Sequence, residues 1–408
     1  MQIQCLKCKG RGFCGRSFCS ILAKSEALFK VKKLDIGEDF LGLAPTPFVG
    51  YHGYPFLNVG ILSAPEIKED VWEYDAPKYW AEHNYEIPKI IDFRSALLNS
   101  RFKAHAQDRN KLLEISQEVG MASAPVDIEV SLKDKPKFRL NTDAYTAPMG
   151  PNAGLKKAEI TSNPKIHTKV DKVVSDIDLK ANDALIYLYQ NKFDENFLTR
   201  LLSVGTLGIR KDRKLVPTRW SISSVDSNIG NYLASNVKEY NQTSYLAYFG
   251  GYLGNYFLIL CFPDVYSYEL FETYMPKSSW NISNKIDYTT DYEPHEGRKS
   301  YAENCGGGFY ACRIALLEKL NRLKKQASVL CLRFITGEYY VPLGVFVVRE
   351  ATRKTLNNKP IEFSSMELML KYAKSLIKKK FNYDLDNLFK ESVILKNIKE
   401  QVKLSSFF

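Results

Sequence analysis

The sequence predicts an α+β protein in which a mixed α/β body lies between a small N-terminal knuckle of four cysteines and a flexible C-terminal peptide tail. Four cysteines fall within the first 19 residues, and the chain ends in two adjacent phenylalanines. Between them, alternating apolar residues typical of strands follow apolar residues at helical spacing. We expect five parts: the knuckle with a basic helix (1–33), a first part of the body (34–124), a long loop or linker (125–180), a second part of the body (181–395) and the tail (396–408).

The composition is that of a protein with an ordinary core. The 408 residues are 45% hydrophobic and 25% charged. The most apolar stretch, 245–263, is interrupted by Gly250, Gly251 and Gly254, which argues against a membrane span. The N-terminus is polar and rich in glycine where a signal peptide would be apolar. We therefore expect an intracellular protein that does not enter a membrane.

The positive charge is concentrated at the two ends of the chain. The formal net charge is +11, of which residues 1–33 carry +7 and residues 351–408 carry +6. The residues between them carry a net −2. Clustered positive charge is typical of a protein that binds nucleic acid, although a basic helix face is often only solvated.

The N-terminal cysteines have the spacing of a metal site. Cys5, Cys8, Cys14 and Cys19 form C-x₂-C-x₅-C-x₄-C, and four thiolates this close can surround one Zn²⁺. Four basic residues between the cysteines would offset the negative charge of such a centre and could touch phosphates: Lys7, Lys9, Arg11 and Arg16. An iron–sulfur cluster uses the same four ligands and remains an alternative to zinc. Disulfides fit poorly with an intracellular protein. We favour a structural zinc.

A short basic helix completes the knuckle part of the chain, and a pair of strands begins the first part of the body. Residues 18–33 predict a short basic helix, and 42–65 predict short strands joined by a turn at 51–54. His52 lies in this turn and is more typical of a turn residue than of a catalytic base. From Asp92 to Val119 the apolar residues recur at three and four positions, which predicts a long helix with a solvated basic face.

The middle of the chain contains the best candidate for a buried polar site. Residues 125–180 are poor in aliphatic side chains and predict a long loop, and 181–205 predict two helices. Near 215–226 a short strand should enter a helix that begins at Ser223 or Ser224. Arg219, just before that helix, could hold an anion, with Asp226 in the first turn. The alternative is that Asp226 only complements the helix dipole.

The second part of the body alternates strands and helices. We expect two strands within 245–262, a glycine-rich entry at 303–313, which includes Arg313, to a helix, and a hairpin over 329–348. A basic amphipathic helix should follow at 366–380, and 388–399 should lead out to the tail. A lone glycine triplet is weak evidence for an anion site. We expect four further cysteines to be thiols of the core and not metal ligands: Cys261, Cys305, Cys312 and Cys331.

The last eight residues carry a recognisable pattern. One helical turn would gather Leu404, Phe407 and Phe408 into an apolar plug, with Gln401 one turn earlier at its rim. This Q-x-x-L-x-x-F-F pattern resembles the peptide box that binds PCNA, the sliding clamp of DNA replication. The alternative is that the two phenylalanines dock on this protein's own surface.

Both ends together are similar to the archaeal Nre family of DNA repair proteins. The knuckle and the terminal box support this resemblance, together with the segments Gly53-Tyr-Pro, Arg219-Trp-Ser-Ile and Gly307-Gly-Phe-Tyr. It implies a cytoplasmic protein that acts on damaged DNA alongside the clamp, with the four cysteines as metal ligands and the box as the clamp contact. No catalytic residue follows from the resemblance.

Two functions from different classes stay open. The first is a clamp-tethered nuclease or hydrolase acting on DNA, with Arg219, Asp226 and Arg313 as candidates for its site. A metal nuclease needs several acidic ligands brought together, and we identify no such cluster in the sequence, which makes a nuclease the less favoured of the enzymes. The second is a non-enzymatic adaptor that grips DNA and links the clamp to other repair factors, because tethering alone raises a local concentration.

Overall fold

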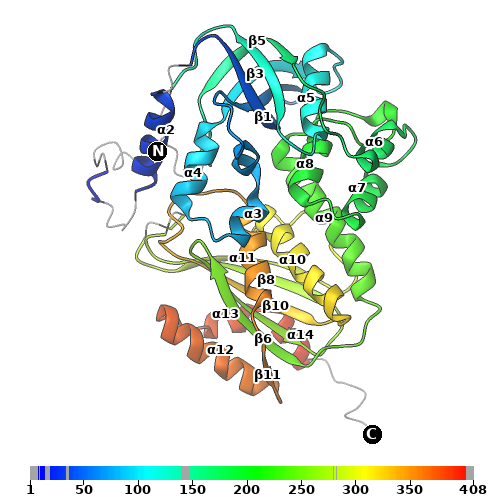
Figure 1. Cartoon of the computed structure of the whole chain (residues 1–408). Coiled ribbons are helices and arrows are strands. Elements are labelled where there is room, and N and C mark those ends of the chain that lie inside the picture. The colour runs from blue at the N-terminus through cyan, green and yellow to red at the C-terminus, as the bar shows by residue number, and fades with distance from the viewer. Residues whose placement is uncertain are drawn as a thin grey trace. The chain divides into compact units, whose positions relative to one another are not determined.

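The computed structural model describes residues 8, 10–13, 19–33, 36–138, 147–278, 280, 281 and 283–400. The chain divides into two compact units (Figure 1). Unit 1 contains the described residues up to Ile229 together with Val341–Leu343, and unit 2 contains those of Gly230–Tyr340 and from Gly344 onward. The mixed α/β character that we expected is confirmed.

Unit 1 is built on a closed five-stranded barrel with the strand order β1-β2-β3-β5-β4. Its strands are β1 (Asp39–Val49), β2 (Phe56–Ala64), β3 (Leu98–His105), β4 (Val126–Leu132) and β5 (Asn152–Ile160). All neighbouring strands are antiparallel except β3 and β5, which are parallel. This order, with a helix between the third and fourth strands, is the topology of the OB-fold.

The barrel core follows from the alternation of side chains along each strand. On β2, Leu57, Val59 and Ile61 point inward and are completely buried. The helix between β3 and β4 is α5 (Lys111–Met121), which lies against β1 and β5 (Figure 1). It buries apolar side chains in the same cluster as the barrel strands, and its N-cap is Asn110, whose side chain accepts the backbone N–H of Leu113.

A tight turn joins β1 to β2. Gly53 has a φ of +83°, and a Cβ atom there would lie 2.9 Å from the backbone oxygen of Phe56. Only glycine adopts this backbone without strain. The backbone N–H of Phe56 donates back to the Gly53 carbonyl at 2.8 Å, which closes the turn.

The other helices that the structure describes in unit 1 precede β1, connect β2 to β3 or follow β5 in the sequence. They are α2 (Ser20–Lys32), η1 (Val71–Asp75), α3 (Pro77–Glu82), α4 (Ile87–Ala96), α6 (Thr168–Ser175), α7 (Ala181–Gln190), α8 (Glu195–Ser203) and η2 (Arg210–Asp212). The boundary between the units falls within α9 (Thr218–Val237).

Unit 2 is a six-stranded sheet with helices on both faces. The strand order is β11-β6-β7-β10-β8-β9, and β10 pairs in parallel with β8. The strands are β6 (Tyr245–Tyr252), β7 (Asn255–Phe262), β8 (Ser267–Tyr274), β9 (Asp287–Glu293), β10 (Ser328–Ile335) and β11 (Ile361–Phe363). The helices are α10 (Gly307–Leu323), α11 (Phe346–Asn357), α12 (Met366–Phe381), α13 (Asp386–Glu391) and α14 (Val393–Glu400).

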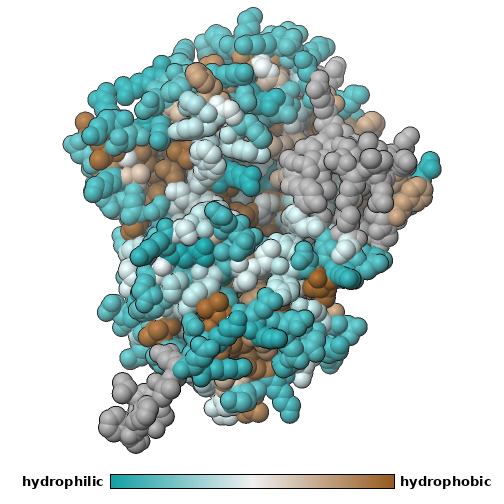
Figure 2. All heavy atoms as spheres, turned by 180° about the vertical axis from the view of Figure 1, so that it is seen from behind, coloured by the Kyte–Doolittle hydropathy of each residue, from teal (hydrophilic) through white to brown (hydrophobic). Residues whose placement is uncertain are grey.

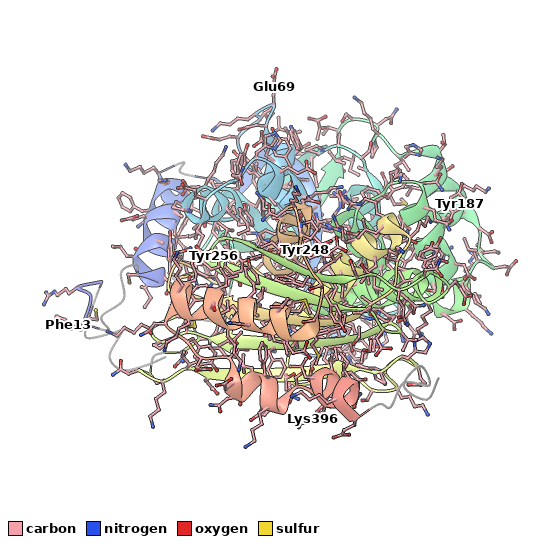
Figure 3. The ribbon with its side chains drawn as sticks, turned by 90° about the horizontal axis from the view of Figure 1, so that it is seen from below. Phe13, Glu69, Tyr187, Tyr248, Tyr256 and Lys396 are labelled. Carbon is pink, nitrogen blue, oxygen red and sulfur yellow. The ribbon has the colours of Figure 1, made fainter. Side chains whose placement is uncertain are left out.

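Successive side chains of the sheet face different helices. The cluster that contains Leu258 and Leu260 packs against α12, α13 and α14, and Tyr256 lies on this face against Phe381 (Figure 3). On the other face Tyr268 packs against Phe309 of α10, and α11 contacts β6 and β7. Unit 2 therefore has three layers, with the sheet in the middle.

Several expected elements differ in the structure. The long helix from Asp92 to Val119 is replaced by α4, β3 and α5, and the loop expected at 125–180 contains β4, β5 and α6. Strands β3 and β4 alternate buried and less buried residues, and this period of two is present in their sequences. The hairpin expected over 329–348 retains β10, but α11 begins at Phe346 in place of its second strand.

No helix within the described ranges is long and apolar enough to cross a membrane. On the face of the molecule drawn in Figure 2, hydrophobic residues form small groups among hydrophilic ones.

Candidate nucleic-acid interface

Two of the four expected zinc ligands, Cys8 and Cys19, belong to the described residues, whereas Cys5 and Cys14 do not. Cys8 is buried, and its Sγ accepts the backbone N–H of Phe13 at 3.3 Å. This hydrogen bond lowers the pKa of the Cys8 thiol and so favours the thiolate that binds metals.

The described residues include only part of the expected zinc site. Where the structure describes the chain, no three His, Cys, Asp or Glu side chains form a group that could hold a metal ion. Because the expected site includes cysteines outside this part, the zinc ion stays a prediction. Of the basic residues between the cysteines, Arg11 is exposed, and Lys7, Lys9 and Arg16 lie outside the described residues.

The expected clamp-binding residues also lie outside the described residues: Gln401, Leu404, Phe407 and Phe408. The preceding helix, α14, ends at Glu400, directly before this box.

The three residues considered for a catalytic site have different surroundings. Helix α9 begins at Thr218, earlier than expected, so Arg219 lies in its first turn and Asp226 lies two turns later, where it is buried. Asp226 is therefore too far from the start of the helix to complement its dipole there. Arg313 belongs to unit 2, where its guanidinium donates to Glu293 Oε1 at 2.7 and 3.0 Å. This pairing gives Arg313 a structural role.

Unit 1 presents exposed aromatic rings around the turn between β1 and β2. Tyr54, in the turn, lies with its ring centroid 5.4 Å from that of Trp220 in the first turn of α9. Phe56, at the start of β2, contacts His105 of β3 edge-on at 5.1 Å. Phe56 is 64% exposed and Trp220 47% exposed, so each ring keeps a large solvent-facing area.

Hydrogen bonds hold the start of α9 beside this turn. The backbone N–H of Val49, at the end of β1, donates to Thr218 Oγ1 at 2.9 Å. The backbone N–H of Leu215 donates to the Ala106 carbonyl at 2.7 Å, which ties the chain before α9 to the end of β3. The guanidinium of Arg219 lies 5.4 Å from the centre of the Tyr51 ring, within the range of a cation–π contact.

Cations continue this surface along β3. The outward residues of β3 are Arg101, Lys103 and His105, and they pair in register with Gly60, Asn58 and Phe56 of β2. None of these six side chains is a carboxylate. We call the following set the aromatic–basic face: Tyr51, His52, Tyr54, Phe56, Arg101, Lys103, His105, Arg219 and Trp220.

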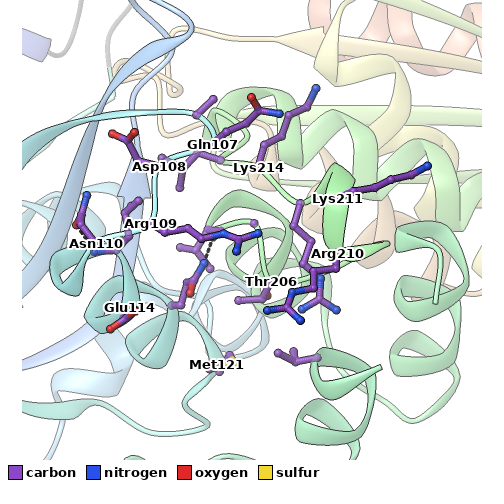
Figure 4. Close-up of a pocket in the computed structure, with 18 residues that line it drawn as sticks. Gln107, Asp108, Arg109, Asn110, Glu114, Met121, Thr206, Arg210, Lys211 and Lys214 are labelled. Atoms are coloured by element: carbon purple, nitrogen blue, oxygen red, sulfur yellow. Dashed lines mark hydrogen bonds between the residues drawn. The ribbon is translucent and has the colours of Figure 1, made fainter. Parts of the chain in front are cut away.

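A pocket of about 530 Å³ lies where the chain leaves β3 (Figure 4). Its walls come mainly from the loop before α5 and from residues 204–215. Five of its lining residues are cationic and two are acidic: Arg109, Arg210, Lys211, Arg213 and Lys214, against Asp108 and Glu114. We call it the basic pocket.

The basic pocket suits an anion. Arg109 extends from the loop before α5 toward Thr206 on the opposite wall (Figure 4). Arg213 is held in place by donating to the carbonyls of Gly208 and Asp176 at 2.7 and 2.9 Å, and burial lowers the pKa of its guanidinium. The Asp108 carboxylate accepts the backbone N–H of His105 at 2.6 Å, so part of its charge is compensated locally.

The aromatic–basic face and the basic pocket are continuous along the backbone. His105 belongs to the face, and the next two residues, Ala106 and Gln107, line the pocket. The sequence does not by itself predict this interface, because its apolar spacing predicts a helix at Arg101 and Lys103 and its turn residues at 51–54 predict only a turn. Alternation of Arg101, Phe102, Lys103 and Ala104 was the available signal.

Comparison with known proteins identifies the family. Residues 13–281 match the family described as Archaeal Nre, N-terminal, and residues 293–407 match Archaeal Nre, C-terminal. No solved structure matches the chain.

Three relatives cover most of this chain. A DNA repair protein NreB of Archaeoglobus fulgidus is 33% identical over 396 residues, which cover 97% of both chains. A DNA repair protein NreA of the same organism is 36% identical over 93% of this chain and 95% of its own length. A DNA repair protein NreA of Haloferax volcanii is 33% identical over 76% of each chain. The chain therefore belongs to the archaeal Nre family, the family of these DNA repair proteins.

Proposed function

We propose that this protein binds DNA during the repair of damage and is recruited to the sliding clamp PCNA by its C-terminal box. The repair role is supported by relatives that carry the name DNA repair protein and match nearly the whole chain. The observation that carries DNA binding is the basic pocket, whose five cations outnumber its two carboxylates. Cations gathered in a concave site attract the phosphates of a nucleic-acid backbone.

Clamp recruitment is supported by the sequence of the tail. Gln401, Leu404, Phe407 and Phe408 match the whole Q-x-x-L-x-x-F-F pattern, and they follow directly after α14. A peptide at the end of a chain can enter a groove of a partner while the folded body stays free to bind DNA. Tethering to the clamp would raise the concentration of the protein at DNA ends and forks.

The N-terminal cysteines support a structural zinc in the same protein. Cys8 and Cys19 would provide two of the four thiolates with Cys5 and Cys14, and the N–H···S bond to Cys8 is of the kind that stabilises metal-bound thiolates. We expect elemental analysis of the purified chain to find about one zinc per molecule. Iron together with acid-labile sulfide would instead show an iron–sulfur cluster.

The salt dependence of DNA binding tests the role of the basic pocket. We expect the double variant Arg109→Ala/Arg210→Ala to bind DNA more weakly regardless of sequence, because two phosphate contacts are lost. The slope of log K against log salt should become less steep by about 2. The matched control is Lys78→Ala, which removes an exposed lysine of α3 outside the pocket.

Fluorescence anisotropy at several salt concentrations gives both the affinity and the slope. A wild-type chain that binds no DNA would contradict the proposed function. A double variant with the wild-type slope would show instead that DNA binds elsewhere on the protein.

A further inference from the structure

We propose that the aromatic–basic face binds single-stranded DNA, with bases stacked on its exposed rings and phosphates held by its cations. This inference rests on the proposed DNA-binding function and names the form of DNA and the residues that contact it.

Exposed aromatic rings gather at one end of the barrel. Tyr54, Phe56 and Trp220 are each more than 40% exposed, and all three lie at one end of β1 and β2 or in the adjoining turn of α9. Clusters of solvent-exposed aromatic side chains are typical of binding surfaces. The hydrogen bond from Val49 to Thr218 fixes Trp220 beside the turn, so the rings are presented on an ordered framework. Rigid presentation lowers the entropic cost of binding.

The cations give the surface its preference for an anionic partner. Arg101 and Lys103 are exposed and make no hydrogen bond or ion pair with any residue that the structure describes. They lie in register with Gly60 and Asn58, which are small or polar, so a chain laid across β2 and β3 can approach the strands. An aromatic surface without such cations would suit a protein partner equally well. Rings next to uncompensated cations suit a nucleic acid.

Stacking selects a single strand over a duplex. The faces of the bases in a duplex are covered by their neighbours, whereas an unpaired strand can place successive bases on protein side chains. The topology of the barrel agrees with this choice, since OB-folds bind oligonucleotides on the face of the second and third strands and on the loop between the first and second. The aromatic–basic face occupies that face and that loop.

The basic pocket extends the same path. His105 ends the face, and Ala106 and Gln107 lead directly into the pocket. A strand whose bases stack on the rings can therefore continue with its phosphates in the pocket. Single OB barrels cover about 4 to 16 nucleotides, which is enough to contact both regions.

The test measures binding of the full chain to an oligothymidylate of about 16 nucleotides. We expect tighter binding to this strand than to a duplex of equal length or to a deoxyribose-phosphate strand without bases. Trp220→Ala and Phe56→Ala should each weaken binding to the single strand by about 5- to 150-fold, because each removes one stacking platform. Trp220→Phe should retain most of the affinity, since a phenyl ring still stacks.

The matched control is Trp72→Ala. Trp72 lies in η1 of unit 1 and is 42% exposed, similar to Trp220, but it does not belong to the aromatic–basic face. The Trp72→Ala variant should bind the oligothymidylate with the affinity of the wild type. Quenching of tryptophan fluorescence by the oligonucleotide should be lost in Trp220→Ala and kept in Trp72→Ala. Circular dichroism melting of each variant checks that it is folded.

The outcomes separate this inference from the proposed function. If Trp220→Ala and Phe56→Ala bind the single strand with wild-type affinity, the face is not the site, while DNA binding by the protein stands. If an oligouridylate binds more tightly than the oligothymidylate and its binding is lost in Trp220→Ala, the occupant is RNA and the assignment to DNA is overturned. If the wild type binds no nucleic acid, both proposals fail.

Discussion

Arg313 is buried together with the carboxylate of Glu293 that it pairs with. Its side chain and that of Glu293 are each only 4% exposed, and the guanidinium donates two hydrogen bonds to one carboxylate oxygen. A sequence-based search for an anion site selects this arginine because it follows three glycines. The structure instead uses it to compensate a carboxylate within unit 2.

We expect Arg313→Ala to lower the free energy of unfolding by about 3–5 kcal/mol, because it leaves the Glu293 carboxylate buried without a partner. Urea denaturation measures this loss. The control is Lys30→Ala, which breaks an ion pair to Asp92 whose side chains are 66% and 39% exposed and should cost less than about 1 kcal/mol. Equal costs for the two variants would contradict the structural role of Arg313.

Glu269 of β8 connects the sheet to helix α14. The residue is fully buried, and its carboxylate accepts the Ser392 hydroxyl at 2.6 Å and the backbone N–H groups of Val393 and Ile394 at 2.9 and 3.2 Å. These donors lie at the start of α14. Burial raises the pKa of the Glu269 carboxyl above its ordinary value of 4.5, although the hydrogen bonds oppose this shift.

The pKa shift of Glu269 predicts a dependence of stability on pH. A raised pKa means that the folded protein holds this proton more tightly than the unfolded chain does. The contribution is therefore complete below pH 4.5 and is lost as pH rises through the folded pKa. Glu269→Gln cannot ionise, so its stability relative to the wild type should improve from pH 4 to pH 7. A difference in unfolding free energy that stays constant with pH would contradict this prediction.

The sequence predicts the helices and strands whose apolar residues recur at an unambiguous helical or strand spacing. The pair β1 and β2 with its turn, the helices α7 and α8, the strands β6 and β7, and the helices α10 and α12 all form within or close to the expected ranges. In each, the period and the flanking turn residues agree. Local signals of this kind are sufficient because the tertiary structure does not oppose them.

Strand β3 shows why other elements could not be read. Its inward residues Leu98, Phe102 and Ala104 are compatible with helical spacing when joined to the true helices on either side. Pairing with β2 and β5 decides the conformation of β3, and both partner strands are distant from it in the sequence. The aromatic–basic face depends on β3. It could not be predicted from the sequence because the strand itself could not be predicted.

The two family segments do not coincide with the two structural units. The segment matched by the N-terminal family ends at residue 281 and the C-terminal one begins at residue 293, whereas the units divide at Ile229. Strands β6, β7 and β8 lie in the first segment, and β10 and β11 lie in the second. Strand β10 is inserted between β7 and β8, so the sheet needs both segments.

We expect residues 1–281 and residues 293–408 to be unable to form the sheet of unit 2 when each is produced alone. Removal of β10 leaves the backbone N–H and C=O groups of β7 and β8 that pair with it without partners. Limited proteolysis of each piece, compared with the full chain, measures this: unit 2 sequences should be cut rapidly in the pieces and slowly in the full chain. Resistance of either piece within its unit 2 sequences would contradict the shared sheet.

The proposal as a whole joins a DNA-binding body to a clamp-binding tail, and clamp binding by two chains side by side tests it most directly. Calorimetry would compare the full chain with residues 1–400, which lack only the box after α14. We expect the full chain to bind PCNA, the truncated chain to lose that binding, and both to bind DNA equally well. Equal affinity of the two chains for the clamp, or no affinity in either, would contradict recruitment by the C-terminal box.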